Sequence, residues 1–232
     1  DEMHLHRAAA TAVAAAMHSC GTRCVHVSSY WSFLPLVGTP MNEDHPRQGG
    51  TPWMQARRAA EDILREAGAA IANLPDFYGP GVHTSTLQQA LVDAAHGRTI
   101  NWIGAKDTER AYCYLPDAAV SLVSLAESDE AYGEHWLIPT AGPLSGRRVA
   151  EIASRAQAAK IKLRSGGLTA LRLFSLVNPP LRPFMQIVPE YVRPISFETV
   201  KIEHLLGPQQ VTAYEEGIKQ TIEWLGAEAS GL

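Results

Sequence analysis

The sequence predicts an α/β protein whose sheet is mostly parallel. Segments with a strand pattern alternate with segments with a helical pattern along most of the 232 residues, and this alternation is typical of helices packed on a parallel sheet. The predicted strands at 23–29 and 69–74 are short apolar runs, as strands buried between helices are. The segment between them carries Ala, Ile and Leu at helical spacing as far as Gly68, so a helix connects the two strands.

The first elements are bounded by residues that start or stop secondary structure. A helix over 4–18 is expected from its Ala content and its lack of breakers. The second helix has Thr51 as its N-cap and Pro52 at its first position. The strand AAIANL stops at Pro75, and PDFYGPG (75–81) is expected to be a loop because Pro and Gly punctuate it.

The later elements continue the alternation. Helices are predicted over 85–96 and 145–159, and strands near 99–104 and 134–139. The stretch 110–128 is expected to be a strand feeding a helix, with Asp117 in the first turn, where a carboxylate suits the helix dipole. A capping box from Thr212 to Glu215 starts a terminal helix. The stretch 166–200 contains NPPLRP and scattered aromatic residues, and it is expected to form a smaller C-terminal lobe.

The composition describes a globular chain. Apolar residues make up 46% and charged residues 19%, which is ordinary for a soluble protein. The formal net charge of −4 gives no basic footprint for nucleic acid. Three Cys residues fit a reducing compartment. The run RAAATAVAAAM is too short to span a membrane, and the acidic start lacks the basic region of a signal peptide. We therefore expect a cytoplasmic protein that binds neither nucleic acid nor membrane.

A metal site near the N-terminus is not expected. His4, His6, His18, Cys20 and Cys24 cluster in the sequence. Cys20 and Cys24 lack a second ligand pair at the spacing of a zinc site, and His4 and His6 would point to different faces of a helix. No Gly-x-Ser-x-Gly sequence supports a hydrolase either.

Polar residues lie at the carboxyl ends of two of the predicted strands. Ser28, Ser29 and Tyr30 follow the first strand, and PDFYGPG follows the second. Parallel sheets place reactive groups at the carboxyl ends of their strands, so these residues are candidates for a functional site. The alternative is that Ser and Gly simply terminate the strands, and the residues alone leave both interpretations open.

Five segments, in order, resemble the NAD-dependent epimerase/dehydratase family, the extended short-chain dehydrogenases. They are RCVHVSS, a helix beginning near TPW, IANLPDFYGPG, RAYCYLPDAAVSLV and TAYEEGIKQTIEWL. The resemblance spans nearly all of the chain, and Tyr-Gly-Pro-Gly and Tyr-x-x-Pro-Asp-x-Ala are its most specific parts. It implies a Rossmann-like doubly wound parallel sheet with a smaller C-terminal substrate lobe. The two domains would occupy mainly 1–140 and 141–232 and would interleave.

The resemblance also implies an activity. Family members bind NAD or NADP and carry out hydride chemistry on a small molecule, often a nucleotide sugar. A Tyr is the acid/base, a Lys four residues later lowers its pKa and holds the nicotinamide ribose, and a Ser or Thr orients the reacting oxygen. A phenol, with its usual pKa of about 10, needs such a cation near neutral pH. Members often pair through helices, so a homodimer through the helix at 53–67 is implied as well.

The catalytic helix departs from the family pattern. Trp53 stands where the Tyr is expected and Arg57 where the Lys is expected. An indole donates a hydrogen bond but exchanges no proton, whereas Arg57 keeps the charge and can still bind a ribose or a phosphate. Tyr30, beside Ser29, is the hypothesis for a replacement hydroxyl, so these four residues are the catalytic candidates. The alternatives are a plain amphipathic helix and packing of Tyr30 and Trp31 against the loop SFLPLVG.

The glycine-rich fingerprint of a dinucleotide-binding fold is missing. Neither G-x-G-x-x-G nor G-x-x-G-x-x-G occurs in the sequence, although such a loop cradles the pyrophosphate at a helix N-terminus. In the family it follows a first strand that lies upstream of where this sequence starts, and the chain begins with Asp1 rather than Met. The resemblance therefore implies an N-terminally incomplete fold, and it does not distinguish NAD from NADP.

Other positions carry over from the motifs of the family. Asn73 stands where Arg-x-x-Asn-x-Tyr-Gly-Pro has Arg, and Asp76 where it has Asn. The implied cofactor-binding residues are Ser28, Arg57, Leu74, Pro75, Asp76 and Phe77. The implied substrate-binding residues are Tyr78, Arg110 and Tyr191, with Arg193 as a further candidate. Ordinary surface positions are the alternative for the last three, and Asp117 is expected to be structural.

Three functions remain open from the sequence. The leading one is an NAD(P)-dependent epimerase/dehydratase-like oxidoreductase that acts on a sugar nucleotide or a similar small polar substrate. The second is a catalytically silent NAD(P)-binding sensor or interaction partner, which Trp53 and Arg57 favour. The third is a folded fragment without dinucleotide binding, whose exposed strand edges and apolar helix faces would favour dimerisation.

Overall fold

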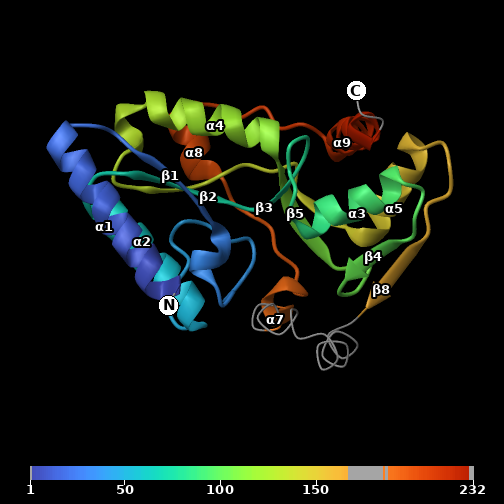
Figure 1. Ribbon diagram of the computed structural model, residues 1–232, viewed down its shortest axis with the longest axis horizontal. Helices are drawn as coiled ribbons and strands as arrows, with labels where there is room; N and C mark the ends of the chain where they lie inside the picture. The colour runs from blue at the N-terminus through green and yellow to red at the C-terminus, as the bar shows by residue number, and fades with distance from the viewer. Residues whose placement is uncertain (1, 167–184, 186–187, 230–232) are drawn as a thin grey trace. The chain divides into compact units, whose positions relative to one another are not determined.

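The computed structural model describes residues 2–166, 185 and 188–229, and its chain divides into two compact units (Figure 1). The first unit comprises Asp1–Pro75, Asp117–Pro139 and Phe197–Gln210. The second unit comprises Asp76–Pro116, Thr140–Ser196 and Val211–Leu232. Each unit is therefore built from segments that lie far apart in the sequence. Which unit serves a cofactor and which a substrate stays a prediction.

A parallel three-stranded sheet forms the centre of the first unit. Its order is β1 (Val25–Ser29), β2 (Ala70–Leu74) and β6 (His135–Leu137), and both pairings are parallel. The middle strand, β2, is buried at every residue, which explains why its sequence is a continuous apolar run rather than an alternating one. The predicted α/β class with parallel strands is confirmed.

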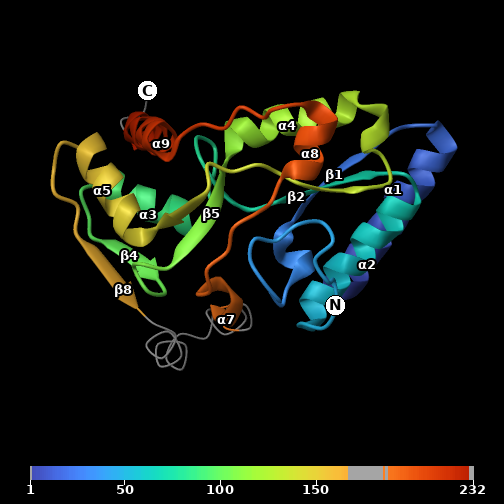
Figure 2. The same cartoon turned by 180° about the vertical axis from the view of Figure 1, so that it is seen from behind.

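The described part of the first unit contains four helices. They are α1 (Glu2–Cys20), α2 (Pro52–Glu66), α4 (Leu115–Glu127) and α8 (Val200–Leu206), with the short 3-10 turns η1 (Tyr30–Phe33) and η2 (Asp129–Ala131). Of these helices, α4 begins in the last residues of the segment Asp76–Pro116 of the second unit. Figures 1 and 2 show α1 and α2 side by side, and α2 packs against β1 and β2. The α2 helix starts as expected, because the Thr51 hydroxyl accepts a hydrogen bond from Met54 N at 3.4 Å.

Two small sheets are seen among the described residues of the second unit. In one of them, β5 (Glu109–Tyr114) lies between β3 (Asp76–Tyr78), to which it is parallel, and β7 (Pro143–Ser145), to which it is antiparallel. In the other, β4 (Ile100–Ile103) pairs in parallel with β8 (Leu163–Gly166).

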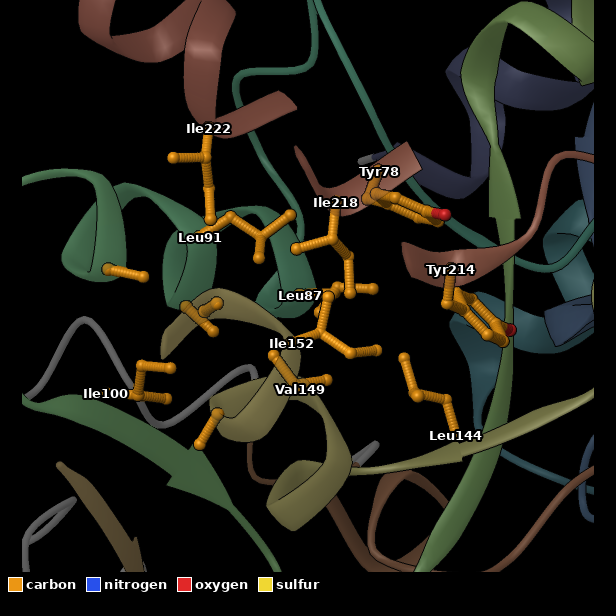
Figure 3. Close-up of a cluster of buried hydrophobic side chains, with 14 of the residues drawn as sticks. Tyr78, Leu87, Leu91, Ile100, Leu144, Val149, Ile152, Tyr214, Ile218 and Ile222 are labelled. Carbon is orange, nitrogen blue, oxygen red and sulfur yellow. The ribbon is translucent and has the colours of Figure 1, made fainter. Parts of the chain in front are cut away.

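Helices α3 (Thr86–Ala95), α5 (Gly146–Ala156) and α9 (Tyr214–Ala229) enclose the core of the second unit, and a short helix, α7, spans Val188–Tyr191. Their apolar faces meet in the cluster drawn in Figure 3. The labelled side chains include Leu87, Leu91, Val149, Ile152, Ile218 and Ile222.

Some elements differ from the sequence-based expectations. The expected loop at 75–81 contains strand β3, and β7, β8 and α8 were not predicted. These strands have three or four residues each, and they exist because distant backbone pairs with them, a condition that no local pattern reveals. Most of the lobe expected over 166–200 lies outside the described residues.

Two glycines of α9 stand in opposite surroundings. A Cβ on Gly217 would lie 2.5 Å from the hydroxyl of Tyr78, whereas a Cβ on Gly226 would meet no atom within 4 Å. Tyr78 is fully buried, so it has little room to move away. The absence of a side chain at Gly217 lets α9 approach the sheet closely.

Replacing each glycine by Ala should therefore change stability in opposite directions. Gly226→Ala should raise the free energy of unfolding by about 0.5–1 kcal/mol, because Ala loses less backbone entropy in a helix. Gly217→Ala should lower it by about 1–3 kcal/mol, because overpacking outweighs that gain. Urea unfolding of both variants measures the two values, and a stabilised Gly217→Ala protein would contradict the close packing seen here.

Candidate functional site

The carboxyl ends of β1 and β2 lie next to each other in the first unit. Their register places Ser28 opposite Asn73 and Ser29 opposite Leu74, so the structure brings these candidate residues together. The hydroxyl of Ser29 accepts a hydrogen bond from Trp31 N at 3.4 Å and caps the turn η1. The buried hydroxyl of Ser28 donates to the carboxylate of Glu61.

Glu61 is the centre of a buried polar cluster. Its carboxylate forms an ion pair with Arg47 (2.7 Å, Nη2 to Oε2) and accepts a hydrogen bond from Asn73 at 3.4 Å. Arg47 also pairs with Asp62 at 2.6 Å. Burial raises the pKa of Glu61, while the hydroxyl of Ser28 and the charge of Arg47 act in the opposite direction. The cluster therefore fixes the end of β1 to α2 and to the loop that carries Arg47.

His135 extends this cluster to the third strand. Its Nδ1 lies 2.9 Å from Oδ1 of Asn73. The Nδ2 group of Asn73 donates to Ser32 and Glu61, so the amide oxygen is the acceptor and the proton of His135 is on Nδ1. Burial, together with the charge of Arg47, lowers the pKa of His135 to about 3. The imidazole is therefore neutral at physiological pH.

Arg47, Glu61 and His135 were not among the candidates from sequence. The burial of Glu61 could have been predicted from its spacing. It lies four residues after Arg57 and three before Leu64, so it shares the inner face of the helix. A carboxylate on such a face needs a partner inside the protein. Nothing local indicates that Arg47 supplies it.

Trp53 and Arg57 lie in contact on α2. The guanidinium of Arg57 lies 4.7 Å from the ring centroid of Trp53, and that ring meets Trp31 edge to face at 6.0 Å. Burial lowers the pKa of Arg57, although the charge of Glu61 opposes the effect, and an Arg side chain stays charged. Arg57 also lines a cavity of about 360 Å³ along β1, together with His26.

The ring of Tyr30 is buried rather than open to a ligand. It is 1% exposed; it packs edge to face against Phe197, with 5.5 Å between ring centroids, and at a tilt against Trp31, at 5.4 Å. The contacts of this ring are therefore with Trp31 and Phe197, and a catalytic role of Tyr30 stays a prediction.

Tyr78 and its neighbours on β3 belong to the second unit. Tyr78 is fully buried in the hydrophobic core, against Tyr114 and Tyr214, so its ring has a packing role in this structure. Asp76 forms an ion pair with Arg110 at 3.4 Å, and Phe77 is half-buried.

Arg110 is a buried clamp. It is 4% exposed, so it is not a solvated surface charge. Its guanidinium donates to the carbonyl oxygens of Arg193, at 2.6 Å, and Glu190, at 3.3 Å, and lies 4.5 Å from the ring centroid of Tyr191. These contacts hold the segment around α7 against β5, with Asp76 as the counter-ion. Arg193 itself pairs with Glu190.

A cavity of about 170 Å³ lies beside this clamp in the second unit. The start of α3, strand β4, Tyr112 and Tyr191 line it. Trp102 and Tyr112 meet there edge to face, at 6.4 Å between ring centroids. The buried Oγ1 of Thr86 has no hydrogen-bond partner among the described residues. Burial raises the pKa of Tyr112, while the charge of Arg110 and the hydroxyl of Tyr191 act in the opposite direction, so its phenol stays protonated.

Neither a group of metal ligands nor a membrane-spanning helix is found in the described part of the chain. Among residues 2–166, 185 and 188–229, no three His, Cys, Asp or Glu side chains are placed to hold a metal ion. No helix in the same part of the chain is long and apolar enough to cross a membrane.

A family model supplies the classification. The model of the NAD dependent epimerase/dehydratase family matches residues 2–138, more than half of the chain. The chain belongs to the NAD-dependent epimerase/dehydratase family. No curated protein sequence matches it. The matched region of this family member contains Ser28, Ser29, Trp53 and Arg57, whereas Tyr191 lies beyond it.

Solved structures of low sequence identity share the fold. UDP-glucuronic acid 4-epimerase from Bacillus cereus with NAD has a TM-score of 0.70 and 12% identity, and the match covers 89% of this chain and 62% of that one. A double mutant of DesIV, a dTDP-glucose 4,6-dehydratase from Streptomyces venezuelae with NAD and DAU bound, has a TM-score of 0.70 and 17% identity. This match covers 93% of this chain and 63% of that one. MoeE5 with UDP-glucuronic acid and NAD has a TM-score of 0.76 and 18% identity, and the match covers 97% of this chain and 71% of that one. The chain thus spans less than two thirds of the first two.

The buried pair of Arg47 and Glu61 predicts a large loss of stability when the cation alone is removed. Arg47→Met leaves the carboxylate buried without its partner and should cost about 3–5 kcal/mol. Urea unfolding at pH 7 measures the loss. Arg147→Met is the matched control, because it breaks an exposed ion pair with Asp107 and should cost less than about 1 kcal/mol. Equal losses of unfolding free energy in the two variants would show that the buried ion pair stabilises the protein no more than the exposed one.

His135 predicts a loss of stability in acid. Its folded pKa of about 3 lies below its usual value of about 6.5, so its stabilising contribution is complete above pH 6.5 or so and is lost as the pH falls toward 3. Across this range the free energy of unfolding should fall by up to about 1.4 kcal/mol per pH unit. Unfolding of His135→Gln at pH 7 and pH 5 should show a smaller difference than the parent protein, and exposed His96→Gln should match the parent. An unchanged difference in His135→Gln excludes this role.

Proposed function

We propose that this chain contains the substrate-binding part, and a portion of the cofactor-binding part, of an NAD(P)-dependent epimerase/dehydratase-like oxidoreductase. The substrate is a sugar nucleotide or a similar small polar molecule. Membership of the family supports the reaction class. The observation that carries the substrate class is the aromatic cavity in the second unit.

The lining of that cavity suits a nucleobase. Trp102, Tyr112 and Tyr191 line the cavity, and contacts of aromatic side chains with a bound base stabilise it by about 1–3 kcal/mol. The Oγ1 of Thr86, which has no hydrogen-bond partner in the described part of the chain, offers a hydrogen bond to its polar edge. Arg110 pairs with Asp76 and donates to backbone carbonyls, so we assign it the role of holding Tyr191, which lines the cavity, rather than a contact with the substrate.

The cofactor is proposed to lie at the carboxyl ends of the strands, where open parallel sheets bind ligands. Ser28, Ser29, Leu74 and Pro75 occupy this position in the first unit, and Asp76 and Phe77 continue the chain from it. The fit of Arg57 is supported by its buried Nε, which has no hydrogen-bond partner among the described residues and can donate to a ribose or phosphate oxygen. NAD or NADP would accept or return the hydride.

A second candidate function has an observation of its own. The position that would carry the catalytic phenol carries Trp53, and its indole is packed between Arg57 and Trp31. The ring of Tyr30 is buried, and the hydroxyls of Ser28 and Ser29 at the end of β1 are bonded to Glu61 and to Trp31 N. This arrangement favours a protein that binds NAD(P) and a nucleotide without turnover, as a sensor or an interaction partner. In either case we expect a homodimer that includes α2.

The cavity is tested by titrating the chain with UDP while recording Trp fluorescence. Trp102→Leu should weaken UDP binding by about tenfold, because an aromatic wall is lost. Trp224→Leu, which changes a half-buried Trp of α9 that does not line the cavity, should leave the affinity unchanged. Equal affinities of Trp102→Leu and the parent protein would refute the assignment of the cavity.

A separate titration with NADH and NADPH tests the cofactor site, and turnover of UDP-sugars separates the two candidate functions. Arg57→Met should abolish any saturable energy transfer from Trp to the nicotinamide if Arg57 holds the ribose. Cofactor and UDP binding without turnover would support the silent protein, whereas turnover would support the enzyme. If the protein binds UDP saturably but binds neither NADH nor NADPH, the proposed substrate site in the second unit stands and the proposed cofactor site is wrong.

A further inference from the structure

The hydroxyl of Tyr214 joins three backbone groups inside the second unit. It accepts a hydrogen bond from Tyr112 N at 2.9 Å, and it lies 2.6 Å from the carbonyl oxygen of Gly142 and 3.1 Å from that of Tyr112. A phenol has one proton to donate, and the shorter contact makes the oxygen of Gly142 its main acceptor. Tyr214 is 6% exposed, so these bonds are shielded from water.

These contacts replace one rung of the ladder between β5 and β7. The register pairs Arg110 with Leu144 and Ala111 with Pro143, so the next residues would be Tyr112 and Gly142. Ala111 N donates to Ile195 O on the opposite edge of β5, and the alternation of peptide groups turns Tyr112 N toward β7. The phenol of Tyr214 stands at the point where the two strands separate and satisfies the groups on both of them.

The backbone that Tyr214 holds carries a wall of the cavity. Tyr112 is 1% exposed, lines the cavity and meets Trp102 edge to face. Its position depends on β5, and at this residue the edge of β5 toward β7 is held by a side chain from α9. The first residue of the terminal helix therefore determines how firmly the phenol of Tyr112 is placed.

We propose that Tyr214 is the positioning residue of the substrate cavity and that it acts through the backbone of Tyr112. This inference rests on the proposed nucleotide-binding function of the cavity. It adds that the C-terminal helix, which does not line the cavity, tunes the affinity for the nucleotide without touching it.

Tyr114 provides a matched control within the same strand. Its hydroxyl donates to Oε1 of Gln220 at 2.6 Å and so also ties β5 to α9. Tyr114 does not line the cavity. Tyr214→Phe and Tyr114→Phe each remove one oxygen that links the same two elements, and only the first change frees the backbone of Tyr112.

The experiment compares these variants in UDP titrations and in ¹⁹F spectra of protein that contains 3-fluorotyrosine. We expect Tyr214→Phe to weaken UDP binding about fivefold, the effect of one net hydrogen bond, and Tyr114→Phe to leave it unchanged. In a Tyr112→Phe background, Tyr214→Phe should weaken binding less, because the coupled phenol is gone. The resonance of Tyr112, assigned by its absence from Tyr112→Phe, should shift or broaden only in Tyr214→Phe.

The two measurements separate this inference from the function on which it rests. An unmoved Tyr112 resonance in Tyr214→Phe overturns the positioning role, and so do equal losses of affinity in Tyr214→Phe and Tyr114→Phe. If the parent protein binds no UDP while the resonance of Tyr112 still shifts in Tyr214→Phe, the positioning role stands and the proposed ligand is wrong.

Discussion

Parallel pairing of β1 with β2 is the constraint from which the first unit follows. Parallel strands cannot be joined by a tight turn, so the chain returns from Ser29 to Ala70 through a long connection that contains α2. That helix then covers one face of the sheet. The middle strand loses contact with water along its whole length, and its one polar side chain, Asn73, must find partners inside the protein.

Glu61 is one of the partners of Asn73, and its own buried carboxylate requires a partner in turn. It accepts hydrogen bonds from Ser28 and Asn73, but an isolated carboxylate in apolar surroundings is costly. Arg47 compensates for it and, by doing so, fixes its own loop to α2. Through Asn73 and His135, polar contacts connect all three strands near the end where parallel sheets bind ligands. The same groups therefore serve stability and define the surroundings of the candidate cofactor site.

Strand β5 has a comparable role in the second unit. Its neighbours on both edges come from distant parts of the chain, and its alternate residues Arg110 and Tyr112 share one face. Arg110 holds the segment of Tyr191, and Tyr112 is held by Tyr214, 102 residues away. The shape of the cavity is thus set by long-range contacts, and its aromatic residues are brought together from three elements.

The sequence by itself determined the α/β class, the order of the longer elements and the family, because periodicity, caps and ordered motifs are local properties. The N-cap at Thr51 and the strands ending at Ser29 and Leu74 were predicted this way. Tertiary structure alone decided that Arg47 pairs with Glu61, that Arg110 is buried, and that Trp102, Tyr112 and Tyr191 share a cavity. The short strands β3, β7 and β8 also depend on it. The physical reason is that burial and pairing depend on residues that are distant in the sequence and that folding brings close, and no local sequence pattern identifies these residues.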